Sequence, residues 1–414
     1  MSVPSNPLGK TLYLGYRNLP FFTRTARRER LRERDGTAIV VRDNRFHVRE
    51  AVDWLIRAQE SSPDRGVARG YSLTWSQHFD ARGWQPSYPE TTGYIIPTFF
   101  DCARYLNDAD LGRRALEMAH WEMAVQLPSG AVMGGTVDRR PPTPAVFNTG
   151  QVILGWLRAH RESGEKAFLE AARRAGAFLV ANQSADGSWS QGNSRFANSR
   201  TTTYNSRVGW ALILLGQRCG DDSFLQAGRR AMHHTLSRQQ ENGWFADNCL
   251  SDPQAPLLHT IVYAMEGLAG AAEALDEASW WQYVILPATH LRERLPPDGR
   301  LPGRFNPAWQ PTVSWCCLTG SAQLAGIWLR LAQRSGDPSW TEAARRLLTF
   351  LKTTQNCVTE HPGLRGGIKG SHPLDGGYGP YELLNWAAKF FIDALLLDDA
   401  TDPAGVAESS PAPG

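Results

Sequence analysis

The sequence predicts an all-α protein with an (α/α)6 toroid fold, in which six helical hairpins place an inner ring of helices inside an outer ring. Three observations lead to this prediction: a helix-opening motif that recurs at a fixed period, six helices that are apolar on every side, and six amphipathic helices that alternate with them. A helix that is apolar all round is buried, whereas an amphipathic helix covers a core. An open superhelical array of helical repeats is the alternative, but six turns favour a closed ring.

A Thr-Gly pair opens a helix at three places along the chain. Thr92 and Thr149 are 57 residues apart, and Thr149 and Thr319 are 170 residues apart, which is about three such periods. The two registers between them fall in apolar segments, and a sixth apolar segment follows after a longer loop. Repeats of this kind are the sequence signature of a repeated structural unit. The inner helices are therefore expected at residues 91–106, 147–160, 204–216, 258–275, 317–332 and 381–397.

Amphipathic segments lie between the apolar ones, and their Arg and Glu residues suit a solvated outer face. The outer helices are expected at residues 47–60, 110–127, 165–183, 221–239, 278–295 and 337–355. Together the twelve helices predict one toroid domain over residues 47–398. Residues 1–46 form a short irregular extension of mixed character, and the polar, Pro-rich residues 399–414 are expected to be a disordered tail.

Composition excludes several classes of protein. The 414 residues carry a net charge of only +3, which does not indicate a nucleic-acid partner. The Arg-rich segment 24–36 interleaves Glu and Asp, so it is interpreted as a solvated helical face. No apolar run is long enough for a membrane span, and no signal peptide is recognisable at the N-terminus. Six cysteines without a pairing rhythm suggest reduced thiols in a cytoplasm, and no metal or other cofactor is expected. The oligomeric state stays open.

The long, irregular loops all lead into the N-termini of the inner helices, and the opposite connections are tight turns. Long loops on a rigid scaffold usually carry function, so the site is expected at the long-loop end. Six helix N-termini favour anions there, and Arg and aromatic side chains are typical of sites that bind anionic sugars. The substrate-binding candidates are Tyr88, Tyr94, Asn148, Tyr204, Asn205, Arg207, Trp315, Tyr378, Tyr381, Arg304 and Arg195.

Glu90 is a singular residue within the repeat. At the equivalent position the other inner helices carry Phe, Tyr, Leu or Cys, so only the first one begins with a carboxylate. Glu382 begins the sixth expected helix, and closure of the ring would bring Glu90 and Glu382 into one cleft. A pair of carboxylates is what glycoside hydrolysis requires, so these two residues are the leading catalytic candidates. A plain helix-terminal charge is the alternative interpretation of Glu90.

His259 and Tyr263 lie one turn apart at the head of the fourth expected inner helix. With Arg and Asn side chains to neutralise a carboxylate, such a pair would suit proton abstraction at C5 of a uronic acid, followed by elimination or epimerisation. The alternative interpretation of His259 is a structural imidazole. Glu266, deeper in the same helix, needs a partner, and an ion pair is as reasonable there as catalysis.

The six-hairpin pattern resembles the (α/α)6 carbohydrate-active enzymes. These include the unsaturated glucuronyl hydrolases and the helical domains of uronate polysaccharide lyases and of D-glucuronyl C5-epimerases. The resemblance covers residues 47–398 in architecture and loop character, without a catalytic motif that matches residue by residue. The stretches YPETTGYIIPTFFD, WCCLTGSAQLAGIWLRL and NWAAKFFIDAL are also similar to bacterial proteins associated with surface-polysaccharide synthesis.

The lead hypothesis is therefore hydrolysis of a glycosidic bond in an acidic, uronate-containing surface polysaccharide or its oligosaccharides. C5 epimerisation or elimination by a lyase is the first alternative. A terpenoid cyclase is another, because QSADGSW at residues 183–189 fits a Q-x3-G-x-W element, but the acidic motifs of those enzymes are missing. Peptide cyclases share the toroid but need zinc ligands that the sequence does not show. A non-catalytic glycan-binding or scaffold protein is the remaining alternative.

Overall fold

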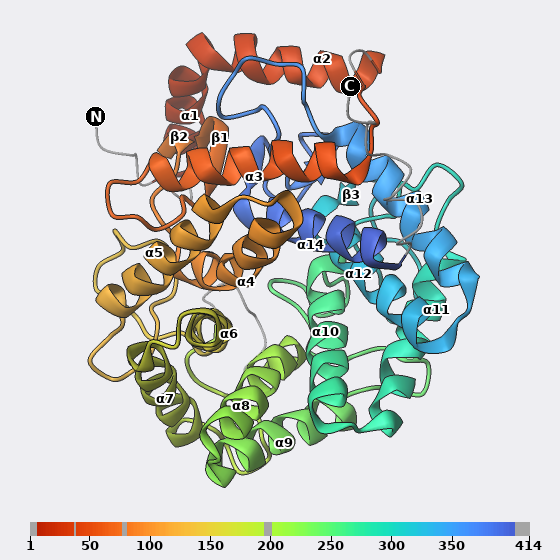
Figure 1. Cartoon of the computed structure of the whole chain (residues 1–414). Coiled ribbons are helices and arrows are strands. Elements are labelled where there is room, and N and C mark those ends of the chain that lie inside the picture. The colour runs from red at the N-terminus through yellow and green to blue at the C-terminus, as the bar shows by residue number, and fades with distance from the viewer. Residues whose placement is uncertain (1–5, 37–38, 77–80, 194–200, 402–414) are drawn as a thin grey trace, which may run out of the picture.

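The computed structural model of this chain describes residues 6–36, 39–76, 81–193 and 201–401. Within these ranges the protein has fourteen α-helices and five short β-strands. None of the helices in the described ranges is both long enough and apolar enough to cross a membrane. Figure 1 shows the helices arranged around a common centre in two concentric rings.

The inner ring closes as the repeat predicts. Each inner helix packs against the next one in the chain, and the last, α14, packs against the first, α4 (Figure 1). The inner helices are α4 (Pro89–Leu106), α6 (Val146–Ser163), α8 (Ser206–Cys219), α10 (Leu258–Leu275), α12 (Leu318–Ser335) and α14 (Asn385–Thr401). The outer helices are α3 (Asn44–Glu60), α5 (Ala109–Val125), α7 (Lys166–Ala181), α9 (Asp222–Ser237), α11 (Gln282–Glu293) and α13 (Pro338–Thr354). The (α/α)6 toroid is therefore confirmed.

The Thr-Gly motif explains how the inner helices approach one another. A Cβ atom on Gly93 would lie 2.8 Å from the Cα atom of Val152 on α6, and one on Gly150 would lie 3.0 Å from the Cα atom of Val208 on α8. The threonine before Gly93 anchors a loop instead, because Thr92 Oγ1 accepts a hydrogen bond from the backbone N–H of Val67 at 3.0 Å. The motif that marks the repeat is thus a packing device.

Close packing of α4 on α6 makes Gly155 sensitive to a single methyl group. A Cβ atom on Gly155 would lie 2.3 Å from the carbonyl oxygen of Gly93. We expect Gly155→Ala to lower the free energy of unfolding by about 1–3 kcal/mol in chemical denaturation, as overpacking of a core does. The control is Gly326→Ala on α12, where no atom lies within 4 Å of the added Cβ. It should be neutral or stabilising by up to ~1 kcal/mol, since Ala favours helix more than Gly does. Equal effects of the two substitutions would contradict this packing.

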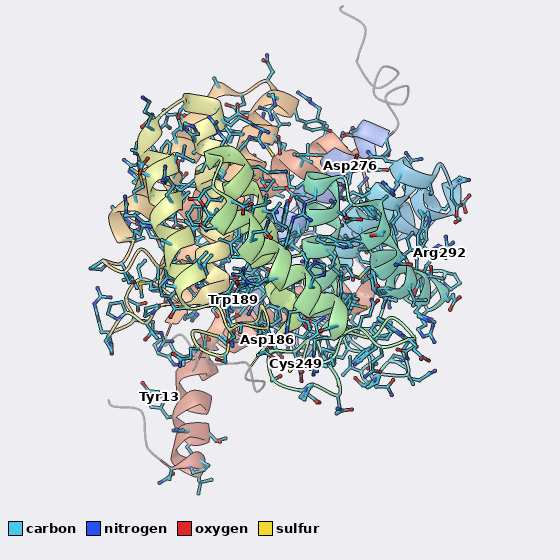
Figure 2. The ribbon with its side chains drawn as sticks, turned by 90° about the horizontal axis from the view of Figure 1, so that it is seen from below. Tyr13, Asp186, Trp189, Cys249, Asp276 and Arg292 are labelled. Atoms are coloured by element: carbon cyan, nitrogen blue, oxygen red, sulfur yellow. The ribbon has the colours of Figure 1, made fainter. Side chains whose placement is uncertain are left out.

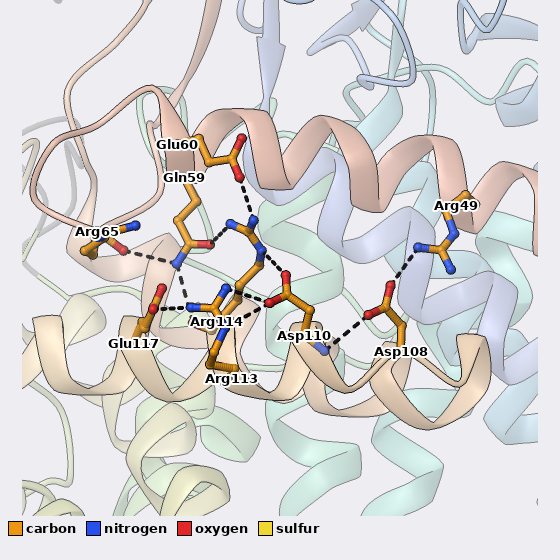
Figure 3. Close-up of polar contacts among 9 residues, drawn as sticks. All are labelled: Arg49, Gln59, Glu60, Arg65, Asp108, Asp110, Arg113, Arg114 and Glu117. Carbon is orange, nitrogen blue, oxygen red and sulfur yellow. Dashed lines mark hydrogen bonds and ion pairs between the residues drawn. The ribbon is translucent and has the colours of Figure 1, made fainter.

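Outer helices are joined by ion pairs on their solvated faces, as Figure 3 shows for α3 and α5. Arg114 of α5 contacts Glu60 of α3 at 2.5 Å, and Arg49 of α3 contacts Asp108 at the start of α5 at 3.0 Å. Asp108 also caps α5, since its side chain accepts a hydrogen bond from the backbone N–H of Asp110. The charged faces expected of the outer helices are therefore confirmed for this pair.

The two ends of the toroid differ, as expected. Figure 2 shows Asp186, Trp189 and Cys249, which belong to long loops, at the end from which α1 (Pro7–Phe21) extends. Asp276, which follows α10, lies at the other end.

The long-loop end also contains short β-strands that join segments far apart in the sequence. β1 (Gly70–Ser76) pairs antiparallel with β2 (Ala81–Trp84) and β5 (Glu382–Leu384), and β3 (Cys316–Cys317) pairs with β4 (Ser371–His372).

Three of the boundaries that differ from the predicted ones concern Glu382 or the ends of the toroid domain. The prediction that Glu382 begins a helix is wrong, because residues 382–384 form strand β5, in which Glu382 pairs with Ser72 of β1. Tyr381, the residue before it, has a φ of 60°, which is not a helical backbone angle. Residues 399–401, which were predicted as the start of the tail, belong to α14, and the rest of the predicted tail, residues 402–414, lies outside the described residues. The first outer helix begins at Asn44, three residues early, with Asp43 as its cap.

The N-terminal extension is helical rather than irregular. Its elements are α1, a π-helical turn η1 (Phe22–Ala26) and α2 (Arg27–Asp35). Residues 24–36 were predicted to form a solvated helical face, and Arg27, Arg30 and Arg34 are indeed exposed. The opposite face of α2 is buried, however, because it carries Glu29 and Arg32. Lys369 is only 1% exposed and pairs with Glu29 at 2.6 Å and with Glu33 at 2.7 Å. Contacts of this kind join segments far apart in sequence, which explains why the local pattern did not predict them.

Candidate active site

Glu90 lies in the first turn of α4, at the long-loop end of the inner ring. Pro89 occupies the first helical position, where its missing N–H is not needed, and no side chain caps the helix. The hydroxyl of Tyr88 donates a hydrogen bond to Glu90 Oε2 at 2.7 Å. The Asn148 side chain, from the first turn of α6, donates a hydrogen bond to the carbonyl of Met133 at 3.0 Å and lies close enough to Tyr88 to affect the pKa of its hydroxyl. Three of the predicted residues therefore lie together at this end of the ring.

The pKa of Glu90 is raised to about 7, and burial among its neighbours is the main cause. The hydrogen bond from Tyr88 and the charges of Arg207 and Arg69 oppose this rise without cancelling it. Glu90 is still partly exposed to solvent. A carboxyl group that titrates near neutral pH can both give and take a proton, which is the property of a general acid–base group.

Aromatic side chains from several inner helices surround this carboxyl group. The ring of Tyr263 on α10 lies 5.0 Å from that of Phe147 and 5.9 Å from that of Phe390. Tyr204, in the 3-10 turn η2 (Thr203–Asn205), packs edge-on against Phe147 at 5.2 Å. Burial raises the pKa of Tyr263 well above its ordinary value, and the charge of Glu90 adds to this effect. The phenol therefore stays protonated at neutral pH.

Two hydroxyl groups meet at the floor of the site. The Tyr94 hydroxyl, from α4, lies beside that of Tyr263, and burial raises the pKa of both. Even so, Tyr263 Oη is buried without a hydrogen bond of good geometry to any described residue. An unpartnered buried hydroxyl is unfavourable in a folded protein and is a common feature of sites that bind a ligand.

Arg207 on α8 sits beneath these rings, with its guanidinium carbon 5.0 Å from the centre of the Tyr263 ring. Its Nε atom donates to Gln151 Oε1 at 2.8 Å, and it forms an ion pair with Glu266. Glu266 also accepts a hydrogen bond from Gln323 Nε2 at 3.1 Å. The charge deep in the fourth inner helix therefore has a structural partner, which was one of the two interpretations of Glu266.

His259 is neutral in this environment. Burial lowers its pKa to about 4, although the hydrogen bond with Gln323 opposes the shift. Nδ1 lies 2.6 Å from Gln323 Oε1, so Nδ1 carries the proton and Nε2 is the acceptor. The ring lies 4.3 Å from that of Tyr263 and 5.6 Å from that of Tyr378, which places all three in one cluster.

Glu382 has a different environment from Glu90. Arg69 Nη1 donates to its Oε2 atom at 2.9 Å, and Ser72 Oγ and Gln85 Nε2 both donate to its Oε1 atom at 3.1 Å. Burial by itself would raise the pKa of Glu382, but the charge of Arg69 and the three hydrogen bonds hold it below the ordinary value. The charge of Arg69 also lowers the pKa of Glu90, so this one arginine acts on both carboxyl groups.

Other predicted binding residues contact different segments. Tyr381 Oη accepts a hydrogen bond from Arg30 of α2 at 3.4 Å, and the Asn205 side chain donates to Asn193 at 3.1 Å. Arg304 lies 6.0 Å from the centre of the Trp315 ring. Arg195 lies outside the described residues.

The sequence analysis missed several residues that build this site. Arg69 forms an ion pair with Glu382, and Gln323 is hydrogen bonded to His259. Gln151 accepts a hydrogen bond from Arg207. Phe390 lies beneath the tyrosines, and Trp386 donates to Tyr378 Oη at 2.9 Å. Phe147 occupies the position in its repeat that Glu90 occupies in the first one, and this equivalence was the only feature of the sequence that could have pointed to it.

Several loop tryptophans anchor the loops instead of facing the site. Trp189 is 1% exposed and donates to the carbonyl of Leu179 at 2.9 Å. Trp309 is 1% exposed, donates to the carbonyl of Asn242 at 2.9 Å and packs on Trp244. These two tryptophans therefore hold the long loops in place. In the described ranges, no three His, Cys, Asp or Glu side chains are arranged to hold a metal ion.

Solved structures share this fold over most of the chain. An unsaturated glucuronyl hydrolase specific for heparin aligns with a TM-score of 0.67 and 14% identity over 86% of this chain and 97% of its own. The unsaturated glucuronyl hydrolase of Bacillus sp. GL1, responsible for glycosaminoglycan degradation, aligns with a TM-score of 0.64 and 15% identity over 84% and 95%. The cellobiose 2-epimerase of Bacillus thermoamylovorans B4167 aligns with a TM-score of 0.63 and 10% identity over 84% and 96%.

No family model matches the sequence, and no curated protein sequence matches it. Identities this low show the fold alone. The chain thus has the (α/α)6 toroid fold found in these carbohydrate enzymes, and the architectural resemblance is confirmed.

Proposed function

We propose that this protein is a carbohydrate-active enzyme that cleaves a glycosidic bond in an acidic, uronate-containing oligosaccharide, with Glu90 as general acid and base. The observation that carries the proposal is the pKa of about 7 at Glu90. This carboxyl group lies among aromatic side chains at the mouth of the inner ring, where a ligand site of the fold is expected. The names of two similar structures, both unsaturated glucuronyl hydrolases, support the substrate class.

Direct hydrolysis uses two carboxyl groups, one as acid and one as base or nucleophile. Glu382 was predicted for the second role, but its carboxylate is already held by Arg69, Ser72 and Gln85. These bonds favour a role in positioning Arg69 beside Glu90. We therefore place both proton transfers on Glu90.

One carboxyl group is sufficient when the terminal uronyl unit carries a C4–C5 double bond. Glu90 gives its proton to C4, which leaves an oxocarbenium ion at C5. Water then adds to C5 as the Glu90 carboxylate takes back a proton. The resulting hemiketal opens, and the hemiacetal formed at C1 releases the neighbouring sugar as an alcohol. We propose this unsaturated uronide as the substrate, because its cleavage needs one acid–base group and Glu90 can supply it.

The charges of the site are compatible with an anion. Arg69 and Arg207 are each paired with a glutamate, so the site is neutral when Glu90 is protonated. The N-termini of the inner helices add partial positive charge at this end. A substrate carboxylate near Glu90 would raise the pKa of Glu90 further by charge repulsion, which keeps the acid protonated for the first step.

Epimerisation is the second candidate, because Tyr263 has an unpartnered hydroxyl and His259 lies against it. However, the pKa of about 4 makes His259 a weak base, and the raised pKa of Tyr263 keeps its phenol protonated. Both properties favour hydrogen-bond donation or acceptance over proton abstraction at C5. Elimination by a lyase meets the same objection, and no observation favours a terpenoid cyclase or a non-catalytic scaffold over hydrolysis.

Proton NMR in D2O with a panel of unsaturated and saturated uronate oligosaccharides tests the proposal. The expected result is loss of the olefinic H4 signal of the unsaturated substrates, with new reducing-end anomeric signals in equal amount. Loss of the H5 signal without cleavage would establish epimerisation instead, and a newly formed olefinic signal from a saturated substrate would establish elimination. A panel that neither reacts nor shifts on binding would contradict an acidic saccharide substrate.

A further inference from the structure

A basic hollow of about 510 Å3 lies where α2 meets the loop before β5. Figure 1 shows α2 outside the ring of inner helices, so this hollow is separate from the centre of the toroid. Its lining is dominated by guanidinium groups, with few acids among them. The lining residues are Arg27, Arg30, Leu31, Glu33, Arg34, Arg300, His372, Pro373 and Asp375.

α2 is held in a defined orientation by its inner face. Lys369 forms ion pairs with Glu29 and Glu33 on the face of α2 that packs on the toroid. Glu33 Oε2 also accepts a hydrogen bond from the backbone N–H of Leu374 at 2.8 Å. Arg32 binds Glu29 and donates to the carbonyl of Thr354 at 3.1 Å. These buried contacts use the acids of the helix to attach it to the toroid. Its arginines are therefore presented to the hollow by a fixed helix.

The arginines that face the hollow recur at helical spacing, since Arg27, Arg30 and Arg34 lie at i, i+3 and i+7. Arg30 contacts Asp375 at 2.5 Å while remaining 54% exposed, and Arg34 pairs with its neighbour Asp35 at 2.9 Å. Arg27 forms no ion pair with any described residue. Arg300 pairs with Asp298 at 3.5 Å, and both side chains are about 60% exposed. Three of the four arginines therefore have an acidic neighbour at or near the surface, while Lys369 already neutralises Glu33.

The segment from Ser371 to Tyr381 connects the hollow with the Glu90 site. His372, Pro373 and Asp375 line the hollow, whereas Tyr378 of the same segment lies in the aromatic cluster with His259. At the end of the segment, Tyr381 contacts Arg30 of α2. The same segment thus contributes residues both to the hollow and to the candidate active site.

We propose that this hollow is an accessory binding site for the carboxylate or sulfate groups of an acidic saccharide chain that extends out of the Glu90 site. The proposal rests on the proposed function for the position of the chain end. Guanidinium groups bind carboxylate and sulfate through paired hydrogen bonds, and several of them on one helix face suit a polymer with repeated charges. The enzyme would then prefer oligosaccharides longer than a disaccharide.

The test measures binding of unsaturated heparin disaccharide and hexasaccharide by isothermal titration calorimetry to the full chain carrying Glu90→Gln. Adding Arg27→Gln, Arg30→Gln and Arg34→Gln should weaken hexasaccharide binding tenfold or more and leave disaccharide binding within about twofold. The matched control adds Arg113→Gln, Arg173→Gln and Arg230→Gln, which removes the same charge from exposed positions on α5, α7 and α9. This control should keep the affinity of the Glu90→Gln parent for both saccharides.

Equal hexasaccharide affinity in the two triple variants, or no gain of affinity with length in the parent, would overturn the proposal. Preferential binding of phosphatidylserine vesicles through these arginines, without saccharide binding, would overturn it as well. Because binding is measured without turnover, its failure is distinct from failure of the proposed function. The single variant Arg30→Gln should show a smaller loss in the same direction, and an unchanged melting temperature would show that α2 stays docked.

Discussion

Replacing Glu90 with Gln should lower turnover of an unsaturated uronate oligosaccharide by ~10²–10⁴-fold while saccharide binding persists. The amide keeps the shape of the side chain and can still accept a hydrogen bond from Tyr88, but its N–H groups are not acidic enough to protonate C4 of the substrate. Steady-state kinetics combined with calorimetric binding separates the two effects. Exposed Glu170→Gln on α7 is the control, and it should leave both quantities unchanged.

The pH dependence of kcat/KM and of stability, compared between the wild type and Glu90→Gln, provides an independent test of Glu90. In the wild type, kcat/KM should fall as pH rises through about 7, because Glu90 then loses the proton that the first step needs. Stability should move in the same window. The pKa of Glu90 is about 7 in the folded state against an ordinary value of 4.5, so the folded state retains a proton that the unfolded state has lost between these values.

The contribution of Glu90 to the stability of the wild type therefore falls between about pH 4.5 and pH 7, since folding then takes up a proton from solution and this uptake becomes less favourable as pH rises. Glu90→Gln removes this effect. Its melting temperature should match the wild type near pH 4.5, rise above it as pH increases, and keep a constant advantage beyond pH 7. A variant that is inactive yet never more stable than the wild type would contradict the burial of this carboxyl group, and full activity would contradict its catalytic role.

Replacing Glu382 with Gln should lower the free energy of unfolding by about 3–5 kcal/mol. The side chains of Arg69 and Glu382 are only 10% and 7% exposed, so the substitution leaves a buried guanidinium without its counter-charge. Urea denaturation measures the loss. Arg69 also acts on Glu90, so the folded variant should show a shifted pH profile of kcat/KM rather than a complete loss of turnover.

Two further variants define this effect. Glu360→Gln breaks the exposed pair with Arg365, in which Glu360 is 93% exposed, and should change stability by less than about 1 kcal/mol. Arg69→Met with Glu382→Leu removes both charges and should recover much of the lost stability. The pKa of Glu382 is depressed in the folded state, so the pair stabilises the protein above the ordinary pKa and loses its effect as pH falls through the folded value. A turnover loss as large as that of Glu90→Gln in a stable variant would instead support direct catalysis by Glu382.

The helices of the toroid and the position of Glu90 were predictable from sequence. Hydrophobic periodicity and the Thr-Gly repeat are local signals, and each inner helix shows the same close glycine packing on its neighbour where the motif occurs. Glu90 was identified because one repeat differed from the others. The clustering of Tyr88, Asn148, Tyr263 and His259 near it followed from placing all inner-helix N-termini at one end.

The states of the ionisable groups were decided by tertiary contacts. Arg69 and Glu382 are 313 residues apart in sequence, and only the pairing of β1 with β5 brings them together. Lys369 likewise binds Glu33 across 336 residues, which converts an apparently solvated charged helix into a docked one.

The sequence by itself therefore determined which segments of the toroid are helical, how many hairpins form the ring and at which end the candidate site is expected, because those properties depend on residue patterns within one or two turns. The tertiary structure alone decided which glutamate is ionised and held in place and which one titrates near neutral pH. That difference depends on burial and on the distance to a counter-charge, and neither can be read from neighbouring residues in the chain.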